Sequence, residues 1–162
     1  MSASDVTIRS ARPSDAETIA ALTKQLGYHT EPSVVASRLA RLLDRSDQQL
    51  VVADDGGRAI GWIHMVVTEY IEADPFVVIG GLVVDRDYRK QGIGTRLLAH
   101  AEAWAEQRGC SVVRLSSTVQ RIEAHKFYER AGYTNIKTQY SFAKSVGAAG
   151  SDALRAFVPD VP

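Results

Sequence analysis

The most informative part of the chain runs from Val77 to Arg108 and reads VVIGGLVVDRDYRKQGIGTRLLAHAEAWAEQR. Residues 77–84 are almost wholly apolar and rich in β-branched side chains, which predicts a strand buried on both faces. Residues 85–94 carry Asp, Arg, Lys and Gly, which are typical of a loop. Apolar residues then recur at helical spacing, so this segment predicts a strand, a glycine turn and an amphipathic helix that ends at Gly109.

The glycine turn predicts a site for an anion. Gly92 and Gly94 lack a Cβ, so the backbone can come close to a ligand. A helix begins directly behind them, and its first amide hydrogens have no partner inside the helix and lie at its positive end. Arg89 and Lys90 add positive charge, and the anion most often bound by such a turn is a phosphate. The third glycine of the dinucleotide fingerprint and the Gly-Lys-Ser/Thr of the P-loop are both missing.

Two motifs resemble one enzyme family. Residues 89–94 read R-x-x-G-x-G, and residues 124–133 read AHKFYERAGY. Together they resemble the GCN5-related N-acetyltransferases (GNAT), in which the first motif grips the pyrophosphate of acetyl-coenzyme A and the second is an A-x-x-F-Y-x-x-x-G-Y/F helix. The resemblance implies an α/β (mixed α+β) acyl-CoA N-acyltransferase fold. This fold has a twisted, mixed, mostly antiparallel central sheet flanked by about four helices, two N-terminal ones on one side and two later ones packing on its faces.

The resemblance also implies which residues bind the coenzyme and act in catalysis. Leu82 is the candidate amide donor to the thioester oxygen, and Tyr128 is the candidate acid for the departing thiolate. Alternatively, Gly80 and Gly81 only relieve packing instead of forming a bulge beside Leu82, and Tyr128 is only a packed core residue. Arg121 is either a further coenzyme contact or a solvated helix start. The full coenzyme-binding set is Leu82, Val83, Val84, Arg89, Lys90, Gln91, Gly92, Ile93, Gly94, Thr95, Arg121, Phe127 and Tyr128.

The general base stays unassigned. Many GNAT relatives carry a glutamate on the central strand, but residues 77–84 contain no carboxylate. Glu69 and Glu72, just before that strand, could bind or deprotonate a cationic amine or could be solvated loop acids. Tyr28 and His29, in the link 27–32, are candidates for substrate binding or belong to a plain surface connection. His64 is interpreted as a core histidine with its hydrogen bonds satisfied.

The implied function is transfer of an acetyl group from acetyl-CoA, the acetyl donor cosubstrate, to a primary amine of a cationic small molecule. The amine would attack directly in a ternary complex. The alternatives are acetylation of a peptide or protein amine, and a non-catalytic sensor module that binds acyl-CoA without turnover.

Composition limits the other possibilities. The chain has 162 residues, which suits one domain, expected over 1–144, with a tail over 145–162 that docks on the body or on a partner. The formal net charge is zero, so nucleic acid and anionic membranes are not expected partners. The single cysteine, Cys110, excludes an internal disulfide and indicates no metal cluster. Without a membrane-length apolar run or signal-peptide core, a cytoplasmic protein is expected, and a homodimer is left open.

The remaining elements follow from local patterns. We expect a strand over 6–9, a helix that begins with a Ser14–Glu17 capping box and ends at Gly27, and a helix over 33–43. A hairpin is expected from strands 50–53 and 60–70 around the turn 54–57. A strand over 112–116 should lie parallel to the central strand. A helix carrying Phe127 and Tyr128 on its inner face and a strand over 133–144 complete the expected order.

Overall fold

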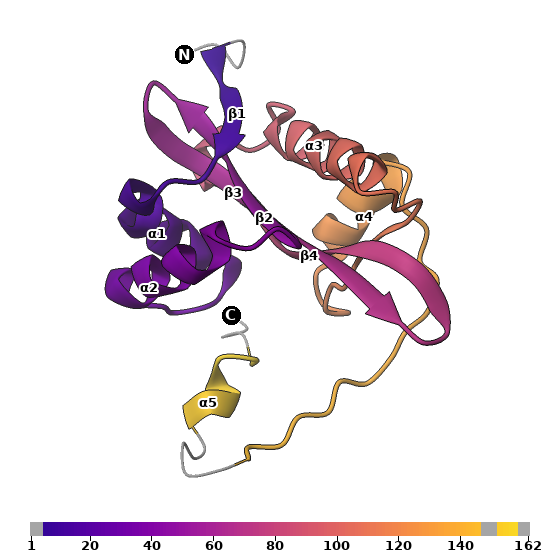
Figure 1. The fold of residues 1–162 in the computed structure, drawn as a ribbon. Coiled ribbons are helices and arrows are strands. Elements are labelled where there is room, and N and C mark those ends of the chain that lie inside the picture. Colours follow the sequence, from indigo (N-terminus) through magenta and orange to yellow (C-terminus); the bar gives the residue numbers. More distant parts are fainter. Residues whose placement is uncertain (1–4, 147–151, 159–162) are drawn as a thin grey trace. The chain divides into compact units, whose positions relative to one another are not determined.

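The computed structural model describes residues 5–146 and 152–158 (Figure 1). The chain forms two compact units, residues 1–115 and 116–162, which are described separately. Among the described residues, no helix is both long and apolar enough to cross a membrane.

The first unit is built on a mixed five-stranded sheet in the order β1-β2-β3-β4-β5. All neighbouring strands are antiparallel except β4 and β5, which are parallel as expected. The strands are β1 (Thr7–Ser10), β2 (Gln48–Asp55), β3 (Arg58–Tyr70), β4 (Ala73–Val84) and β5 (Val113–Leu115), and the helices are α1 (Ala16–Leu26), α2 (Pro32–Leu43) and α3 (Ile93–Gln107).

The helices of this unit cover both faces of its sheet. Helices α1 and α2 lie on one face and α3 on the other (Figure 1). The α1/α2 side has a core in which Leu22 and Leu39 pack with Val52, Trp62 and Val83 of the strands. The α3 side buries the helical stripe predicted from the sequence, at Leu97, Leu98, Ala101, Trp104 and Ala105. The strand–turn–helix prediction and the 54–57 hairpin turn are therefore confirmed.

The start of α1 differs from the prediction. The Ser14–Glu17 capping box is wrong, because Ser14 lies inside a 3-10 turn, Pro13–Asp15, that precedes the helix. Asp15 is buried there and accepts hydrogen bonds from the Arg9 guanidinium at 2.8 and 2.9 Å and from the Arg12 amide at 2.7 Å. Arg9 also reaches Asp54 at 3.1 Å, so the charge group ties β1 to β2 and to the start of α1.

The contacts of Asp15 with Arg9 and Arg12 lead to a prediction about the free energy of unfolding. Desolvation alone would raise the pKa of Asp15, but the hydrogen bonds from Arg9 and Arg12 outweigh it and hold that pKa below the ordinary 3.8. A carboxyl with a lowered pKa stabilises the fold above its unfolded pKa, and the stabilisation is lost as pH falls through the folded value. Asp15→Asn should therefore lower the free energy of unfolding at pH 7 by about 2 kcal/mol, because Arg9 keeps only Asp54. Urea unfolding at pH 7 and pH 3 measures this, and a difference between the two proteins that does not shrink at pH 3 contradicts it.

The second unit contains α4 (Ile122–Arg130) and α5 (Asp152–Arg155). The strand expected over 133–144 is wrong, because the structure assigns no strand to these residues. Ile136, Tyr140 and Phe142 of this stretch are all exposed, so their apolar side chains are not packed as those of a core strand would be. Of the expected tail 145–162, residues 147–151 and 159–162 lie outside the described residues. Both its docking and a single domain over 1–144 stay predictions.

Candidate active site

Strand β4 carries a bulge at the predicted position. His64 of β3 pairs with Gly81, but the next residue, Met65, pairs with Ile79, so Gly80 is left without a partner on β3. One extra residue in one strand is the definition of a β-bulge. The prediction that β4 is buried on both faces fails here, because Gly80 is exposed and Leu82 is only half-buried. The bulge exposes Gly80 and leaves Gly81 and Leu82 half-buried, whereas Val83 beyond it is buried.

The bulge also reverses which backbone groups face the edge of β4 away from β3. Before it, the Val77 amide donates to Val112, beside β5, at 3.0 Å, whereas after it the Asp85 amide donates to Ile60 of β3 at 2.8 Å. Backbone groups alternate along a strand, so Leu82 and Val84 point away from β3. In the first unit β5 pairs with β4 only from Val77 to Ile79, which leaves this edge open at Leu82.

The glycine turn has the geometry of an anion site. Lys90 and Gly92 adopt left-handed conformations, with φ of 61° and 80°. Gly92 is the N-cap of α3, and the first bond inside the helix runs from the Arg96 amide to the Gly92 carbonyl at 3.0 Å. The three amides that precede it, 93–95, therefore have no acceptor inside the helix. A Cβ built on Gly92 would meet nothing within 4 Å, so the turn is not packed against other atoms at this residue.

Two side chains just before the turn contact neighbouring strands. The Tyr88 hydroxyl donates to the Asp55 carboxylate at 3.0 Å, which raises the pKa of Tyr88. The Arg89 Nε donates to the Val84 carbonyl at 3.0 Å, which bends this side chain back onto the open edge of β4. The Tyr88–Asp55 contact was not predicted, because its partners lie on separate elements and neither residue belongs to a motif.

The last turn of α1 lies against the same part of β4. A Cβ on Gly81 would lie 3.9 Å from Leu26 Cδ2, and the Arg86 amide donates to Gln25 Oε1 at 2.9 Å. Helix α1 ends at Leu26 with Gly27 as its C-cap, so the link that carries Tyr28 and His29 starts beside the bulge. The structure thus brings the predicted substrate loop close to the central strand.

The predicted acidic residues lie elsewhere. Glu69 and Glu72 lie at the tip of the β3–β4 hairpin, and Glu69 is five residues along β3 from His64, or about 17 Å at strand spacing. The structure does not bring them together with the bulge. His64 Nε2 lies 2.9 Å from Gln48 Oε1, and burial lowers the pKa of His64.

The second unit brings three predicted residues together. Arg121 is the N-cap of α4, and its charge partly opposes the effect of burial, which raises the pKa of Tyr128. The Phe127 and Tyr128 ring centroids are 5.2 Å apart. Both aromatic residues are half-buried, as expected for the inner face of this helix. The phenol of Tyr128 therefore keeps its proton at neutral pH.

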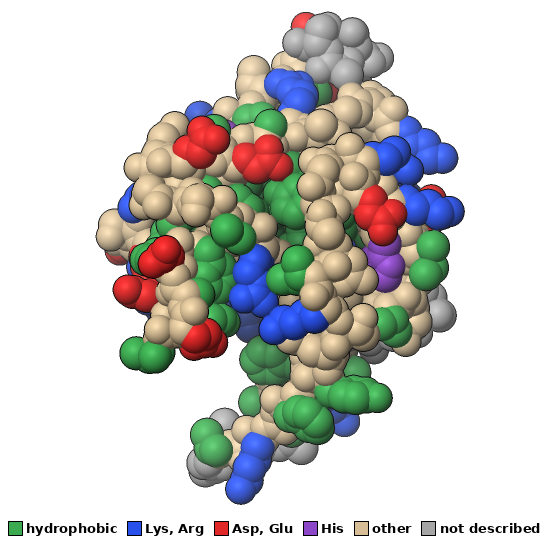
Figure 2. Space-filling model, turned by 90° about the vertical axis from the view of Figure 1, so that its right-hand side faces the viewer, with side chains coloured by type: hydrophobic (Ala, Val, Ile, Leu, Met, Phe, Trp, Pro, Cys, Tyr) green, Lys and Arg blue, Asp and Glu red, His purple; other side chains and the backbone are tan. Residues whose placement is uncertain are grey.

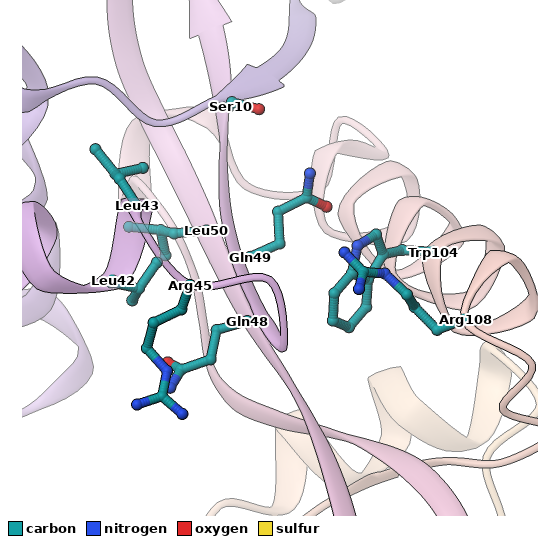
Figure 3. A pocket seen from close by; sticks show the side chains of 9 residues that line it. All are labelled: Ser10, Leu42, Leu43, Arg45, Gln48, Gln49, Leu50, Trp104 and Arg108. Atoms are coloured by element: carbon teal, nitrogen blue, oxygen red, sulfur yellow. The ribbon is translucent and has the colours of Figure 1, made fainter.

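A cavity of about 260 Å³ in the first unit is not part of this arrangement (Figure 3). It lies between the start of β2, the end of α2 and the last turn of α3, with Gln48, Leu50, Trp104 and Arg108 in its wall. No predicted site residue lines it. Among the described residues, no group of three or more His, Cys, Asp and Glu side chains could hold a metal ion. Acidic and basic side chains share the face shown in Figure 2, consistent with the zero net charge.

An open strand edge followed by an anion-binding helix start is a site for an extended ligand with an anionic group. The sequence profile of the Acetyltransferase (GNAT) family matches residues 16–133, and the chain belongs to that family. It is an N-acetyltransferase, and acetyl-coenzyme A is its acetyl donor.

Individual relatives agree with this assignment. An aminoglycoside N(6')-acetyltransferase type 1 of Acinetobacter genomosp. 13 is 27% identical over 67% of this chain and 78% of its own length. An aminoalkylphosphonate N-acetyltransferase of Salmonella typhimurium is 34% identical over 56% of this chain and 58% of its own. The solved aminoglycoside antibiotic 6'-N-acetyltransferase of Acinetobacter baumannii has a TM-score of 0.76 at 22% identity and covers 88% of this chain and 99% of that one. This structural likeness shows the fold alone.

The residues of the first unit fit the coenzyme. The edge that β5 leaves unpaired offers the backbone groups of Leu82 and the Val84 amide to an amide-containing arm, while Arg89 holds the Val84 carbonyl. The amides of 93–95 offer hydrogen bonds to a diphosphate. Arg89 and Lys90 are exposed beside the turn and add positive charge. Which residues of this chain contact the coenzyme stays a prediction.

Proposed function

We propose that this protein transfers the acetyl group of acetyl-CoA to a primary amine of a cationic small molecule, by direct attack in a ternary complex. The observation that carries the proposal is the Gly80 bulge, which points the Leu82 amide to the open edge of β4. A preorganised amide at that position can stabilise the negative charge that develops on the thioester oxygen. The turn at Gly92 holds the diphosphate at the other end of the same ligand.

The reaction needs one bond to form, one to break and two proton movements. The amine nitrogen bonds to the acetyl carbon, and the carbon–sulfur bond breaks. The nitrogen loses a proton, and the departing thiolate gains one. In this proposal Tyr128 supplies the proton to sulfur, because its raised pKa keeps the phenol protonated and a thiol normally has a pKa near 8.5.

The names of the relatives support a small amine as acceptor. Both curated relatives described above are named for amino compounds, an aminoglycoside and an aminoalkylphosphonate. The link after α1 begins beside the bulge and carries Tyr28, His29 and Glu31, whose side chains can donate or accept hydrogen bonds or bind a cation.

Thiol release measured with a panel of amines tests the proposal. The panel contains aminoglycosides, aminoalkylphosphonates, polyamines and peptides, and the matched control is the N-acetylated form of each active amine. We expect turnover with a cationic small amine and none with its acetylated form. Turnover with peptides alone contradicts the proposed acceptor, and coenzyme binding without any turnover favours the sensor alternative.

The single cysteine gives a second prediction about the route. A two-step route would need a nucleophile to carry the acetyl group, but Cys110 is buried, with 3% of its surface exposed. Cys110→Ala should therefore leave kcat unchanged. Initial rates measured at several fixed amine concentrations should give intersecting double-reciprocal lines. Parallel lines, or loss of activity in Cys110→Ala, would contradict direct attack.

A further inference from the structure

His64 occupies the space that a side chain on β4 would otherwise fill. A Cβ built on Gly80 would lie 3.0 Å from His64 Nδ1, with three imidazole atoms as its nearest neighbours. His64 pairs with Gly81, and Gly80 is the unpaired residue of the bulge. The absence of a side chain at Gly80 thus leaves the imidazole against the exposed backbone of the bulge.

The hydrogen bond on the other side of the ring sets its tautomer. Gln48 Oε1 lies 2.9 Å from His64 Nε2, and an amide oxygen can only accept. With the Gln48 amide in this orientation, the proton is on Nε2 and Nδ1 carries the lone pair. Among the described residues, the His64 ring makes one hydrogen bond, from Nε2 to Gln48, and none at Nδ1. A free basic nitrogen therefore lies next to the bulge.

We propose that His64 is the general base that removes the proton from the amine as it attacks. The inference rests on the proposed function, and it assigns the role for which residues 77–84 offer no carboxylate. The proton moves from the amine nitrogen to Nδ1, directly or through one water, while nitrogen bonds to the acetyl carbon. The imidazolium that forms keeps its Nε2–H bond to Gln48 and releases the proton to solvent after the product leaves.

The electrical state of His64 agrees with this role. Burial is the one cause that lowers its pKa, with no charged group of the described residues on β2, β4 or α1 contributing. His64 is therefore neutral at pH 7 and ready to accept a proton. Glu69 and Glu72 lie at the tip of the β3–β4 hairpin, away from the bulge, whereas the His64 ring lies directly against Gly80.

The test compares His64 with a matched histidine on the other face of the sheet. His100 of α3 is also partly buried and lies 3.4 Å from a β2 glutamine, Gln49. His64→Gln and His64→Ala should lower kcat with the best amine by about 100-fold or more, whereas His100→Gln should leave it unchanged. The dissociation constant of acetyl-CoA, measured by calorimetry, should stay the same in all variants, which separates catalysis from folding.

Two further experiments, a chemical rescue and a pH–rate profile, separate a base from a merely structural residue. Added imidazole should restore part of the activity of His64→Ala, because it can enter the vacated space as a replacement base. Gln48→Glu should place a carboxylate on Nε2, raise the pKa of His64 and move the acidic limb of the pH–rate profile to higher pH. Gly80→Ala should also lower kcat, since its methyl group would press on Nδ1.

The outcomes distinguish this inference from the function on which it rests. If the wild type acetylates amines and His64→Gln is equally active, His64 is not the base and the proposed function stands. An equal loss in His64→Gln and His100→Gln, with no rescue by imidazole and no pH shift in Gln48→Glu, also overturns the inference. If the wild type binds acetyl-CoA but acetylates no amine, both the proposed function and the role of His64 fail.

Discussion

Gly92→Asp is expected to weaken acetyl-CoA binding by about 100-fold, or about 2.7 kcal/mol, whereas Gly92→Asn should keep most of the affinity. The two side chains have the same shape and differ in charge. Gly92 has a φ of 80°, a left-handed conformation that Asn and Asp tolerate better than other side chains do. A Cβ there meets open space, so neither substitution clashes with the protein.

The expected loss comes from repulsion at the start of α3. The amides of 93–95 face the space in which the coenzyme diphosphate would lie, and a carboxylate on Gly92 would enter that space. Two unit charges at about 4 Å near a protein surface repel by about 4 kcal/mol, which exceeds the predicted loss. The carboxylate would also compete for the same amides.

Calorimetric titration of acetyl-CoA into the wild type and both variants measures this effect. Thermal unfolding of the three proteins checks that each is folded. A higher salt concentration should reduce the difference in acetyl-CoA affinity between Gly92→Asp and Gly92→Asn. If Asp and Asn bind the coenzyme equally well, the diphosphate does not lie at this turn. If the wild type itself does not bind, the assignment of the turn to acetyl-CoA fails.

Tyr128→Phe is expected to lower kcat by about 100-fold or more while the dissociation constant of acetyl-CoA hardly changes. The substitution removes only the hydroxyl group and keeps the ring that packs on Phe127. Burial raises the pKa of Tyr128, so the wild-type phenol can give its proton to the thiolate throughout the neutral range. Without that proton the sulfur must leave as a bare anion.

Steady-state thiol release measures kcat, and calorimetry on the same preparations measures the dissociation constant of acetyl-CoA. Tyr140→Phe is the matched control, because Tyr140 is 90% exposed and removal of its hydroxyl should change neither kcat nor the dissociation constant. Full activity in Tyr128→Phe would show that another group protonates the sulfur. A parallel loss of coenzyme affinity would make Tyr128 a binding residue instead.

Much of the fold could be predicted because its signals are local. The apolar run at 77–84, the glycines of the turn and the helical stripe behind them each lie within one short segment, and all three appear in the structure. Gly80 and Gly81 also indicated a bulge, although the sequence alone left open that they only relieve packing. One prediction from a local pattern was wrong. The strand expected over 133–144 is absent, because a strand needs a hydrogen-bonded partner as well as a suitable local sequence.

The rest of the site depends on pairings between distant residues. The start of α1 is an example outside the site. Ser14 and Glu17 have the spacing of a capping box, but the structure has the ion pairs of Arg9 with Asp15 and Asp54 there instead. His64 likewise became informative only when its register placed it against Gly80 and beside Gln48. A lone histidine in an apolar strand gives no such sign in the sequence.

The way α1 ends on β4 bears on how this enzyme could change its specificity. Leu26 and Gln25 anchor the end of the helix beside Gly81 and Arg86, so the link that carries the predicted substrate residues Tyr28 and His29 starts from a fixed point apart from the turn at Gly92. Substitutions in this link could accumulate without altering how the acetyl donor is held. Selection for a new acceptor would then act on a few adjacent codons, while the rest of the site passed unchanged from one lineage to the next.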